Sequence, residues 1–318
     1  MAAYHVQKIS SKQKDRLVSK INFSKLLARK ADIHGTCIKL FCDSLQTVRM
    51  WEGNFNPMPD DIRPHARLFS LTDKSGRLRV LYEPNSSTVF IYNCDYYGWI
   101  KSIALALASD YLWDSPSLEN RRYPVHGSLV DVNGRALAII GQPKSGKTTL
   151  TYGLLTHKKF NFLTDDWFFV RFLGGKIQVF SAEKNSYAGE DIAQNWPELA
   201  GRIAGLKADN HGRSIVDVAH LFGASRVRKH SVLAAVVLLR REKGKPVWRK
   251  LSPRTAARWM VKHDFCNPHQ LNRSKAREAD QAAFFAKLFS KAPVYLLNTT
   301  ETPAGSLARL LKLAGKRM

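Results

Sequence analysis

The eight residues Gly141–Thr148 form the strongest chemical motif in the sequence. They read Gly-Gln-Pro-Lys-Ser-Gly-Lys-Thr and match the pattern G-x-x-x-x-G-K-[ST]. An apolar run, Ala136–Ile140, enters the motif, and a helix is expected over Thr148–Leu155. Small residues ahead of a helix let backbone N–H groups surround phosphate oxygens, and the helix dipole adds positive potential there. Lys147 could then bridge the β- and γ-phosphates, and the Thr148 hydroxyl could ligate Mg²⁺. The residues expected to bind a nucleotide are Gly141, Gln142, Pro143, Lys144, Ser145, Gly146, Lys147, Thr148 and Thr149.

Two adjacent carboxylates, Asp165 and Asp166, form a second candidate site. They follow the apolar pair Phe162-Leu163 and precede the apolar run Trp167–Val170. Paired carboxylates at the end of a buried strand are costly unless they bind metal or protons. One could orient Mg²⁺, and the other could deprotonate an attacking hydroxyl. The alternative is an ordinary pair of turn aspartates, but the phosphate-binding motif upstream favours a chemical role.

Three further residues carry weaker signals. His126 follows Pro124-Val125 at the start of an expected strand, where a single histidine usually has a structural role. Asp209 is one acid among many, and Arg249 is one of many arginines. The local sequence therefore assigns no particular role to Asp209 or Arg249.

The net charge of +24 over 318 residues is concentrated at the two ends of the chain. Residues 1–32 carry a net charge of +6, residues 33–220 a net charge of +2, and residues 221–318 a net charge of +16. A basic surface attracts nucleic acid, anionic membranes or acidic proteins, although it can also serve solubility alone. The motifs lie in the nearly neutral middle, so we expect an acceptor or an acidic partner to dock at the basic ends.

Composition excludes several classes of protein. With 44% hydrophobic and 24% charged residues, the chain can bury a core and is not mainly disordered. The longest uncharged apolar run, Val232–Leu239, falls far short of the roughly 20 residues that a membrane span needs. Met1–Ser10 lacks the apolar segment of a signal peptide. Cys37, Cys42, Cys94 and Cys266 show no CxxC pairing. We therefore expect a cytoplasmic protein with reduced thiols.

Residues 1–120 are expected to form an α+β N-terminal domain. Residues 8–32 are interpreted as a basic amphipathic helix packed on this domain, in preference to one that binds a membrane or nucleic acid. A second helix is expected over residues 97–113, and the polar residues 114–123 are predicted to be the domain boundary. Turn signals predict a small antiparallel sheet formed by Thr36–Cys42, Ala66–Thr72, Arg77–Glu83 and Ser87–Asn93.

Residues 121–318 are expected to form a second domain, of the α/β class. Val125–Val132, the turn Asn133-Gly134 and Ala136–Ile140 predict a β-hairpin. Further strands are expected at Phe162–Leu163, Trp167–Leu173, Ile177–Phe180, Ser214–Val218, Leu233–Leu239 and Val294–Leu297. Helices are expected at Asp191–Leu206, Pro253–His263, Ala276–Phe289 and Ala304–Ala314.

Together these motifs resemble the catalytic domain of bacterial HPr kinase/phosphorylase. That family opens its domain with a His-Gly-x-x-Val-Asp hairpin, continues into a Walker A loop and then carries an Asp-Asp pair. Here the matching segments are His126–Asp131, Gly141–Thr148 and Asp165-Asp166, and Ser214–Ala224 looks like the family's signature segment ending in Leu-Phe-Gly-Ala. The resemblance implies a P-loop kinase fold related to that of phosphoenolpyruvate carboxykinase, with ATP and Mg²⁺ bound.

The same resemblance assigns roles to individual residues. Lys147 would bind phosphate, Asp166 would take the proton from a substrate serine, and His126 would match the family's active-site histidine. Counted back from the Leu-Phe-Gly-Ala anchor, Asp209 falls where the family has a metal-binding glutamate, and Arg249 falls where it has an active-site arginine. The implied catalytic residues are His126, Lys147, Asp166 and Arg249, and the implied metal ligands are Thr148, Asp165 and Asp209.

The sequence departs from the family in two places. Residues 209–214 read Asp-Asn-His-Gly-Arg-Ser where the family has Glu-Ile-Arg-Gly-Leu-Gly. Because that segment is associated with the protein substrate and the reverse reaction, the departure weakens the expectation that HPr is the substrate or that the reverse reaction occurs. The first 120 residues do not resemble the usual N-terminal domain, so the chain looks more like the HPr-kinase-related kinases of other bacteria. HPr kinases are hexamers, which makes a homo-oligomer an expectation by analogy only.

Three functions remain open at this point. The leading one is an ATP- and Mg²⁺-dependent phosphotransferase that acts on a serine of a protein or peptide, with an acidic substrate expected from the basic ends. The second is a kinase whose acceptor is a nucleic acid or a small molecule, although no RNA-binding motif is visible. The third is a nucleotide-binding switch without catalysis.

Overall fold

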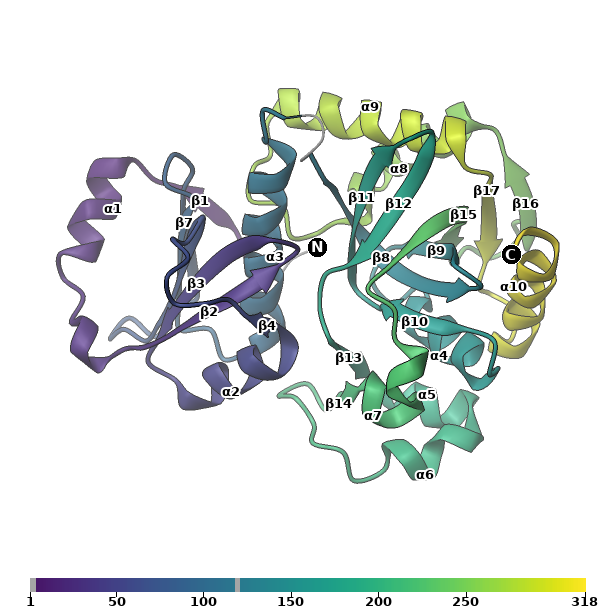
Figure 1. Cartoon of the computed structure of the whole chain (residues 1–318), viewed down its shortest axis with the longest axis horizontal. Coiled ribbons are helices and arrows are strands. Elements are labelled where there is room, and N and C mark those ends of the chain that lie inside the picture. Colours follow the sequence, from purple (N-terminus) through teal and green to yellow (C-terminus); the bar gives the residue numbers. More distant parts are fainter. Residues whose placement is uncertain (1–3, 118–120) are drawn as a thin grey trace. The chain divides into compact units, whose positions relative to one another are not determined.

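The computed structural model describes residues 4–117 and 121–318, and the chain divides into two compact units (Figure 1). The first unit comprises Met1–Arg121 and Pro268–Asn272, and the second comprises Arg122–Asn267 and Arg273–Met318. Part of the expected boundary segment, residues 118–120, lies outside the described residues. Among the residues that the structure describes, no helix combines the length and apolar character needed to cross a membrane.

The first unit is built on a seven-stranded sheet in the order β1-β6-β7-β5-β3-β2-β4. Its strands are β1 (Val6–Lys8), β2 (Leu27–Ile33), β3 (Thr36–Cys42), β4 (Asn56–Pro57), β5 (Ala66–Leu71), β6 (Arg79–Glu83) and β7 (Thr88–Tyr92). Its helices are α1 (Ser11–Val18), α2 (Leu45–Asn54) and α3 (Tyr97–Trp113), with a 3₁₀ turn η1 (Phe23–Lys25). Figure 1 shows α1 and α3 on opposite sides of this sheet.

The sheet of the first unit is mixed, so the expectation of an antiparallel sheet is wrong. β3 and β7 each pair with β5 in parallel. Helix α2 was not predicted from the sequence. It lies in the connection between β3 and β5, which therefore form a crossover unit. A strand that is followed by a helical crossover returns parallel to its predecessor.

The expected helix over residues 8–32 is also corrected. Only Ser11–Val18 is α-helical, and it begins at a capping box in which Ser10 and Gln13 satisfy each other's backbone N–H groups. Residues 27–33 form β2, which pairs antiparallel with β3. The turn between these strands, His34-Gly35, has positive φ at both residues, 51° and 81°. This is the twist that a two-residue hairpin requires, and strand pairing here overrides the helical spacing of the apolar residues.

The core of the first unit contains a row of aromatic rings. The rings of Phe41, Phe69 and Phe90 stack in sequence across β3, β5 and β7, with 4.8 Å between neighbouring ring centroids. The segment Pro268–Asn272 is held within this unit, because Tyr4 Oη lies 2.8 Å from His269 Nδ1. The stacked rings give the first unit an apolar core of its own.

The second unit combines an eight-stranded sheet with a two-stranded one. The larger sheet contains β8 (Tyr123–Val132), β9 (Arg135–Gly141), β10 (Asn161–Thr164), β11 (Trp167–Leu173), β12 (Lys176–Ser181), β15 (His230–Arg240), β16 (Trp248–Leu251) and β17 (Val294–Asn298). The smaller one contains β13 (Asn185–Ala188) and β14 (Ser214–Asp217). The helices are α4 (Lys147–Thr156), α5 (Glu190–Asn195), α6 (Ala200–Ile203), α7 (Val218–Phe222), α8 (Pro253–Lys262), α9 (Lys275–Lys291) and α10 (Pro303–Arg317). The 3₁₀ turns are η2 (Pro197–Leu199), η3 (Ala224–Arg226) and η4 (Asp264–Cys266).

The large sheet closes on itself through its pairings. β8 pairs with β9 and β11, β11 with β12, β12 with β15, and β15 with β9. The predicted hairpin is confirmed as β8 and β9, joined by Asn133 and Gly134 with φ of 53° and 77°. β9, β15 and β17 run parallel, so the predicted α/β character of this part of the chain is confirmed.

Helix α4 is buried in the core of the second unit. Leu150 and Leu154 on α4 belong to the same apolar cluster as Ile139 on β9 and Leu310 on α10, so the helix that follows the motif Gly141–Thr148 is fixed in place. The expected helix over residues 191–206 is interrupted. Pro197 lacks a backbone N–H and clashes with the preceding turn, and the chain forms α5, η2 and α6 in its place.

Candidate functional site

The predicted phosphate-binding loop follows β9 directly and ends in α4. Gly146, which precedes α4, has a φ of 97°, and Lys144 has a φ of 65°. This backbone curl gathers N–H groups toward one point. A Cβ on Gly141 would lie 2.5 Å from Ser145 Oγ and 2.9 Å from Leu239 Cβ, so the loop closes tightly against β15. Within the described residues, the buried Ser145 hydroxyl has no hydrogen-bond partner. Such a loop fits a phosphate group.

Lys147 is buried inside this loop. Its Nζ donates to the backbone carbonyl of Gly141 at 2.9 Å and to that of Gln142 at 3.3 Å. Burial lowers the pKa of the Lys147 ammonium, while nearby acidic groups, Asp166 foremost, oppose that shift. A cation held against carbonyls beside two carboxylates is suited to meet the negative charge of a phosphate chain.

Asp165 accepts hydrogen bonds from three hydroxyl groups. Ser186 on β13 donates to Oδ2 at 2.8 Å, Ser128 on β8 donates to Oδ1 at 3.1 Å, and the Thr148 hydroxyl is the third donor. Burial raises the pKa of Asp165, and these hydrogen bonds, led by the one from Ser186, lower it in part. The carboxylate is therefore held rigidly next to the hydroxyl predicted to bind Mg²⁺. A cation placed there would favour its charged form.

Asp166, the second of the two adjacent aspartates, contacts His126. His126 Nε2 is 2.9 Å from Asp166 Oδ1, and the backbone N–H of Gly127 donates to the carbonyl of Asp166 at 2.9 Å. The strand register supports this contact, because Trp167 on β11 pairs opposite His126 on β8. The Asp166 side chain is 36% exposed and that of His126 only 7%. A molecule arriving from solvent can therefore reach the aspartate, while the histidine stays buried.

The two ring nitrogens of His126 both face hydrogen-bond acceptors. Nδ1 is 2.6 Å from the backbone carbonyl of Cys266, which can only accept, so Nδ1 carries a hydrogen. Nε2 faces the carboxyl group of Asp166. The two groups are 2.9 Å apart, which is hydrogen-bonding distance. His126 is thus held between the Cys266 carbonyl and the Asp166 carboxyl group, an arrangement suited to general acid–base chemistry.

The carbonyl that holds His126 belongs to an unusual turn. In η4, Asp264, Phe265 and Cys266 have φ of 49°, 52° and 55°, so three successive non-glycine residues are left-handed. Each such residue costs about 1–3 kcal/mol. Burial raises the pKa of the Cys266 thiol to about 12, although the charge of Lys147 opposes the shift. The turn therefore lies next to both Lys147 and His126.

Asp209 and Arg249 lie in different surroundings. The Asp209 carboxylate accepts from Arg213 Nη2 at 2.7 Å and Nε at 3.0 Å. Burial would raise the pKa of Asp209, but hydrogen bonds, led by that from the backbone of Arg213, lower it overall. Arg249 is exposed on β16, opposite Leu296 on β17. β16 is the third strand beyond β9, about 14 Å away at the usual strand spacing, so the metal and catalytic roles of these two residues stay predictions.

Two more of the residues predicted to bind a nucleotide, Thr149 and Gln142, contact other parts of the second unit. Thr149 Oγ1 donates to Asp191 Oδ2 at 2.7 Å, so its hydroxyl anchors α4 to α5. Gln142 Nε2 donates to the carbonyl of His263 at 2.7 Å. Among residues 4–117 and 121–318, no group of three or more His, Cys, Asp or Glu side chains is placed to hold a metal ion. Mg²⁺ commonly uses one or two carboxylates together with phosphate oxygens and water.

Two curated proteins that carry the same name are similar to part of this chain. No family model matches the chain. The HPr kinase/phosphorylase of Lactobacillus acidophilus is 25% identical over 119 residues, which are 37% of this chain and 31% of that protein. The HPr kinase/phosphorylase of Pediococcus pentosaceus is 26% identical over 125 residues, 38% of this chain and 34% of that protein. Over this part of its length, the chain is similar to HPr kinase/phosphorylases. The match spans about a third of the length of these curated relatives.

A solved structure of an HPr kinase was also found. The Hpr(Ser) kinase/phosphatase from Coxiella burnetii shares 14% identity, with a TM-score of 0.35, over 61% of this chain and 98% of that one. The resemblance to HPr kinase/phosphorylases that the motifs predict is therefore carried by the curated relatives.

Three residues of the site were not predicted from the HPr-kinase-like motifs. Ser128 lies within the entry hairpin, and a serine inside an apolar strand was a usable signal. Ser186 and Cys266 gave no signal, because each reaches the site from a distant part of the chain. Both are buried, with 1% and 2% of their surface exposed.

Proposed function

We propose that this protein is an ATP- and Mg²⁺-dependent kinase that transfers the γ-phosphoryl group to the hydroxyl of a serine in a protein or peptide. The observation that carries the proposal is the hydrogen bond between His126 and Asp166 beside the phosphate-binding loop. A nucleotide-binding protein without catalysis has no need for a solvent-exposed carboxyl group that is held by a buried histidine. The HPr-kinase-like relatives support the same reaction class.

The nucleotide would bind on the loop Gly141–Thr148. Backbone N–H groups and Lys147 would hold the phosphates, and Thr148 and Asp165 would hold Mg²⁺. Bound there, Mg²⁺·ATP supplies the phosphoryl group and the charge that polarises it. The three hydroxyl donors around Asp165 would keep this carboxylate in one position, so that little reorganisation is needed.

Asp166 would act as the general base. With its carboxyl group exposed, it can accept the proton of an acceptor hydroxyl while His126 holds it in orientation from the buried side. Positioned proton transfer of this kind contributes roughly 10²–10⁴-fold to a rate. Lys147 would stabilise the negative charge on the transferring group, and the role of Arg249 in the same task stays a prediction.

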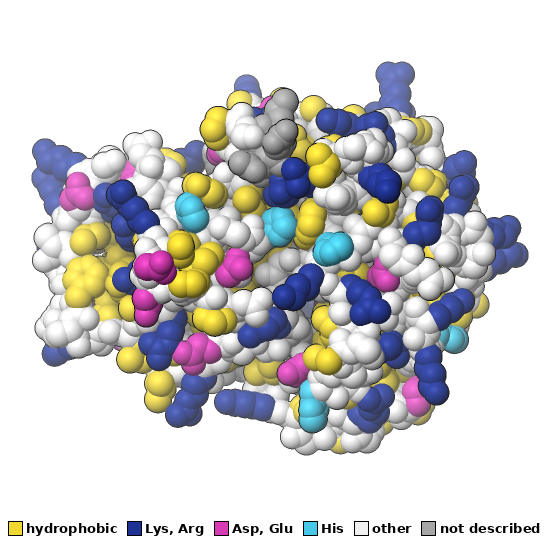
Figure 2. Space-filling view, viewed as in Figure 1, with side chains coloured by type: hydrophobic (Ala, Val, Ile, Leu, Met, Phe, Trp, Pro, Cys, Tyr) yellow, Lys and Arg dark blue, Asp and Glu magenta, His cyan; other side chains and the backbone are white. Residues whose placement is uncertain are grey.

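An acidic acceptor is proposed from charge. Residues 221–318 carry a net charge of +16, and Figure 2 shows Lys and Arg side chains spread over the visible face, with fewer Asp and Glu. Arg254, Arg258 and Lys262 are exposed at intervals of four residues on α8, so they share one helix face. This row would favour an acidic segment of the acceptor.

The decisive experiment uses Asp166→Ala and Asp166→Asn. With γ-labelled ATP and a lysate of the parent cells, the wild type should label a protein band, and both variants should lose at least about 100-fold of that label. ATP binding, measured by calorimetry, should change little. Asp280→Ala, which removes an exposed acid on α9, is the matched control. Transfer at the wild-type rate by Asp166→Ala would contradict the role of Asp166 as the general base.

The same assay separates the two alternative functions. Release of ADP without any labelled acceptor indicates hydrolysis or a switch. A labelled nucleic acid or small molecule in place of a protein indicates the second kinase class. Nucleic-acid binding driven by the basic ends should also fall steeply with salt, so a flat salt response would remove that alternative.

A further inference from the structure

The left-handed turn η4 is stabilised from several directions. The ring of Phe265 stacks on that of Phe285 on α9, with centroids 5.8 Å apart and planes inclined by 11°. Arg273 pairs with the carboxylate of Asp264 at 2.9 Å. The backbone N–H of Cys266 donates to the carbonyl of His263 at 2.9 Å. A sparsely populated backbone conformation persists only where its surroundings over-determine it, and these contacts meet that condition.

The carbonyl groups at the two ends of the turn hold two parts of the candidate site. The carbonyl of Cys266 accepts from His126 Nδ1 at 2.6 Å. The carbonyl of His263 accepts from the side chain of Gln142, in the phosphate-binding loop, at 2.7 Å. Because the direction of each carbonyl follows from φ and ψ, a right-handed or extended conformation at residues 264–266 would turn these acceptors away from His126 and Gln142.

We propose that the left-handed turn Asp264–Cys266 is a positioning element. Its Cys266 carbonyl fixes the orientation of His126 toward Asp166, and the His263 carbonyl at its start ties that pair to the phosphate-binding loop. The proposal rests on the proposed kinase function for what His126 and Asp166 do, but the hold on the ring itself does not depend on it. The sequence of the turn, Asp-Phe-Cys, has no glycine to relieve the backbone strain. Strain retained next to reacting groups is typical of functional sites.

The backbone conformation can be tested at Asp264, which is exposed, so that a new side chain there does not disturb the core. Asparagine tolerates the left-handed region, whereas a β-branched residue does not. Asp264→Val should therefore release the Cys266 carbonyl from His126, and Asp264→Asn should keep it while weakening the ion pair with Arg273. Asn133→Val is the matched control. It places the same residue at an exposed left-handed position, with φ of 53°, in the hairpin between β8 and β9.

The first measurement is ¹⁵N NMR of the full chain with labelled histidine, with the His126 signals assigned from a His126→Gln sample. The Nδ1–H proton of His126 should exchange slowly in the wild type, in Asp264→Asn and in Asn133→Val. In Asp264→Val it should exchange at least about 10-fold faster, because its acceptor has moved. Slow exchange in Asp264→Val, or fast exchange in the wild type, would overturn the proposal.

The second measurement is the rate of label transfer from γ-labelled ATP to protein in the lysate. Asp264→Val should be about 10- to 100-fold slower than the wild type, which is the scale of a misplaced catalytic group. Asp264→Asn and Asn133→Val should stay within about 2-fold of the wild type. An equal loss in Asp264→Asn would mean that the ion pair matters and not the backbone, and an equal loss in Asn133→Val would mean general destabilisation. Either result overturns the positioning role. A wild type that transfers no label contradicts the kinase function instead, and the NMR measurement still decides whether the turn holds His126.

Discussion

The Ser186 hydroxyl donates a hydrogen bond to Asp165 Oδ2 at 2.8 Å. Ser186 lies on β13 in the small sheet, whereas Asp165 follows β10 of the large sheet. This bond joins the small β13–β14 sheet to the end of β10. It also supplies the leading hydrogen bond that offsets the burial of the carboxylate. The geometry of the proposed Mg²⁺ site therefore depends on a segment that carries no recognisable motif.

Replacing Ser186 with alanine should weaken the use of Mg²⁺. A hydrogen bond to a charged group contributes about 1.5–3 kcal/mol. Without it, the pKa of Asp165 should rise further, which favours the protonated carboxyl group. We expect a lower stability and an Mg²⁺ requirement raised about 10-fold in the transfer assay. Ser231→Ala is the matched control, because Ser231 is buried and donates to Asp131 Oδ2 at 2.6 Å. It should lower stability similarly but leave the Mg²⁺ requirement as in the wild type. An unchanged requirement in Ser186→Ala would contradict the role given to Asp165.

Gly141→Ala should close the phosphate-binding loop to ATP. The added methyl group would lie 2.5 Å from Ser145 Oγ and 2.9 Å from Leu239 Cβ, both too close for a real contact. We expect ATP affinity, measured by calorimetry, to fall by about 10-fold or more, since a methyl group forced into a packed site commonly costs 1–3 kcal/mol. Adding Ser145→Ala should not restore binding, because the contact with β15 remains. Gly315→Ala, at an open position on α10, should bind ATP normally. Full affinity in Gly141→Ala would show that the loop is not the nucleotide site.

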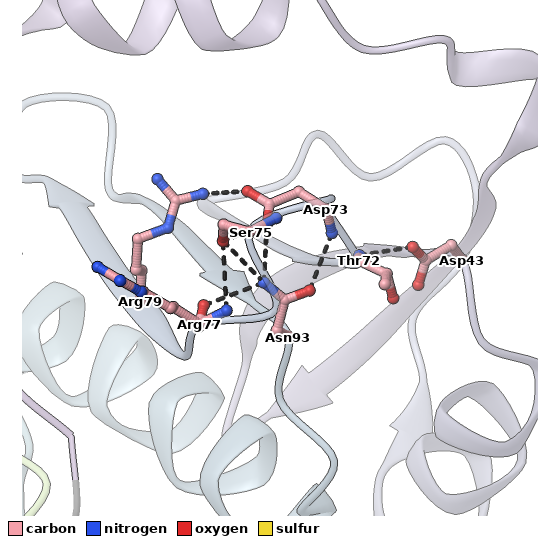
Figure 3. Close-up of polar contacts among 7 residues, drawn as sticks. All are labelled: Asp43, Thr72, Asp73, Ser75, Arg77, Arg79 and Asn93. Atoms are coloured by element: carbon pink, nitrogen blue, oxygen red, sulfur yellow. Dashed lines mark hydrogen bonds and ion pairs between the residues drawn. The ribbon is translucent and has the colours of Figure 1, made fainter.

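Asp73 should give the first unit a pH-dependent stability. Hydrogen bonds from Ser75 and then from Asn93 lower the pKa of Asp73 from 3.8 to about 2, and Arg79 contributes an ion pair (Figure 3). A carboxyl group whose pKa is lower in the folded state stabilises the fold above its unfolded pKa. That contribution is therefore complete above about pH 4 and is lost as the pH falls toward 2.

Removing the donor tests this prediction. Ser75→Ala should bring the pKa of Asp73 back toward 3.8 and move the acid unfolding midpoint, followed by circular dichroism between pH 2 and 5, to a higher pH. Asp61→Asn changes an exposed acid of the same unit and serves as the comparison. A midpoint that moves to lower pH in Ser75→Ala, or one that does not move, would show that the hydrogen bonds in Figure 3 do not carry this stability.

Local signals were sufficient for some elements. The hairpin β8–β9 follows from Asn133-Gly134 between two apolar runs, and helix α4 follows from the motif at its start. Both depend on contacts between residues close in the chain, so the sequence contains nearly all of the information. The same reasoning failed for residues 8–32, where pairing of β2 with β3 outweighs the helical spacing of the apolar residues.

The sequence by itself determined the glycine-rich motif Gly141–Thr148, the paired aspartates and the resemblance to HPr kinases, because each is a short run of residue types with a fixed spacing. Only the tertiary structure decided which groups surround Asp165 and which surround Asp166. The partners of this pair come from other elements: His126 from β8, Ser186 from β13 and, through His126, the Cys266 carbonyl from η4. Cys266 and His126 are 140 residues apart in the chain. Such contacts arise when strands pair and the core packs, and no local pattern encodes them.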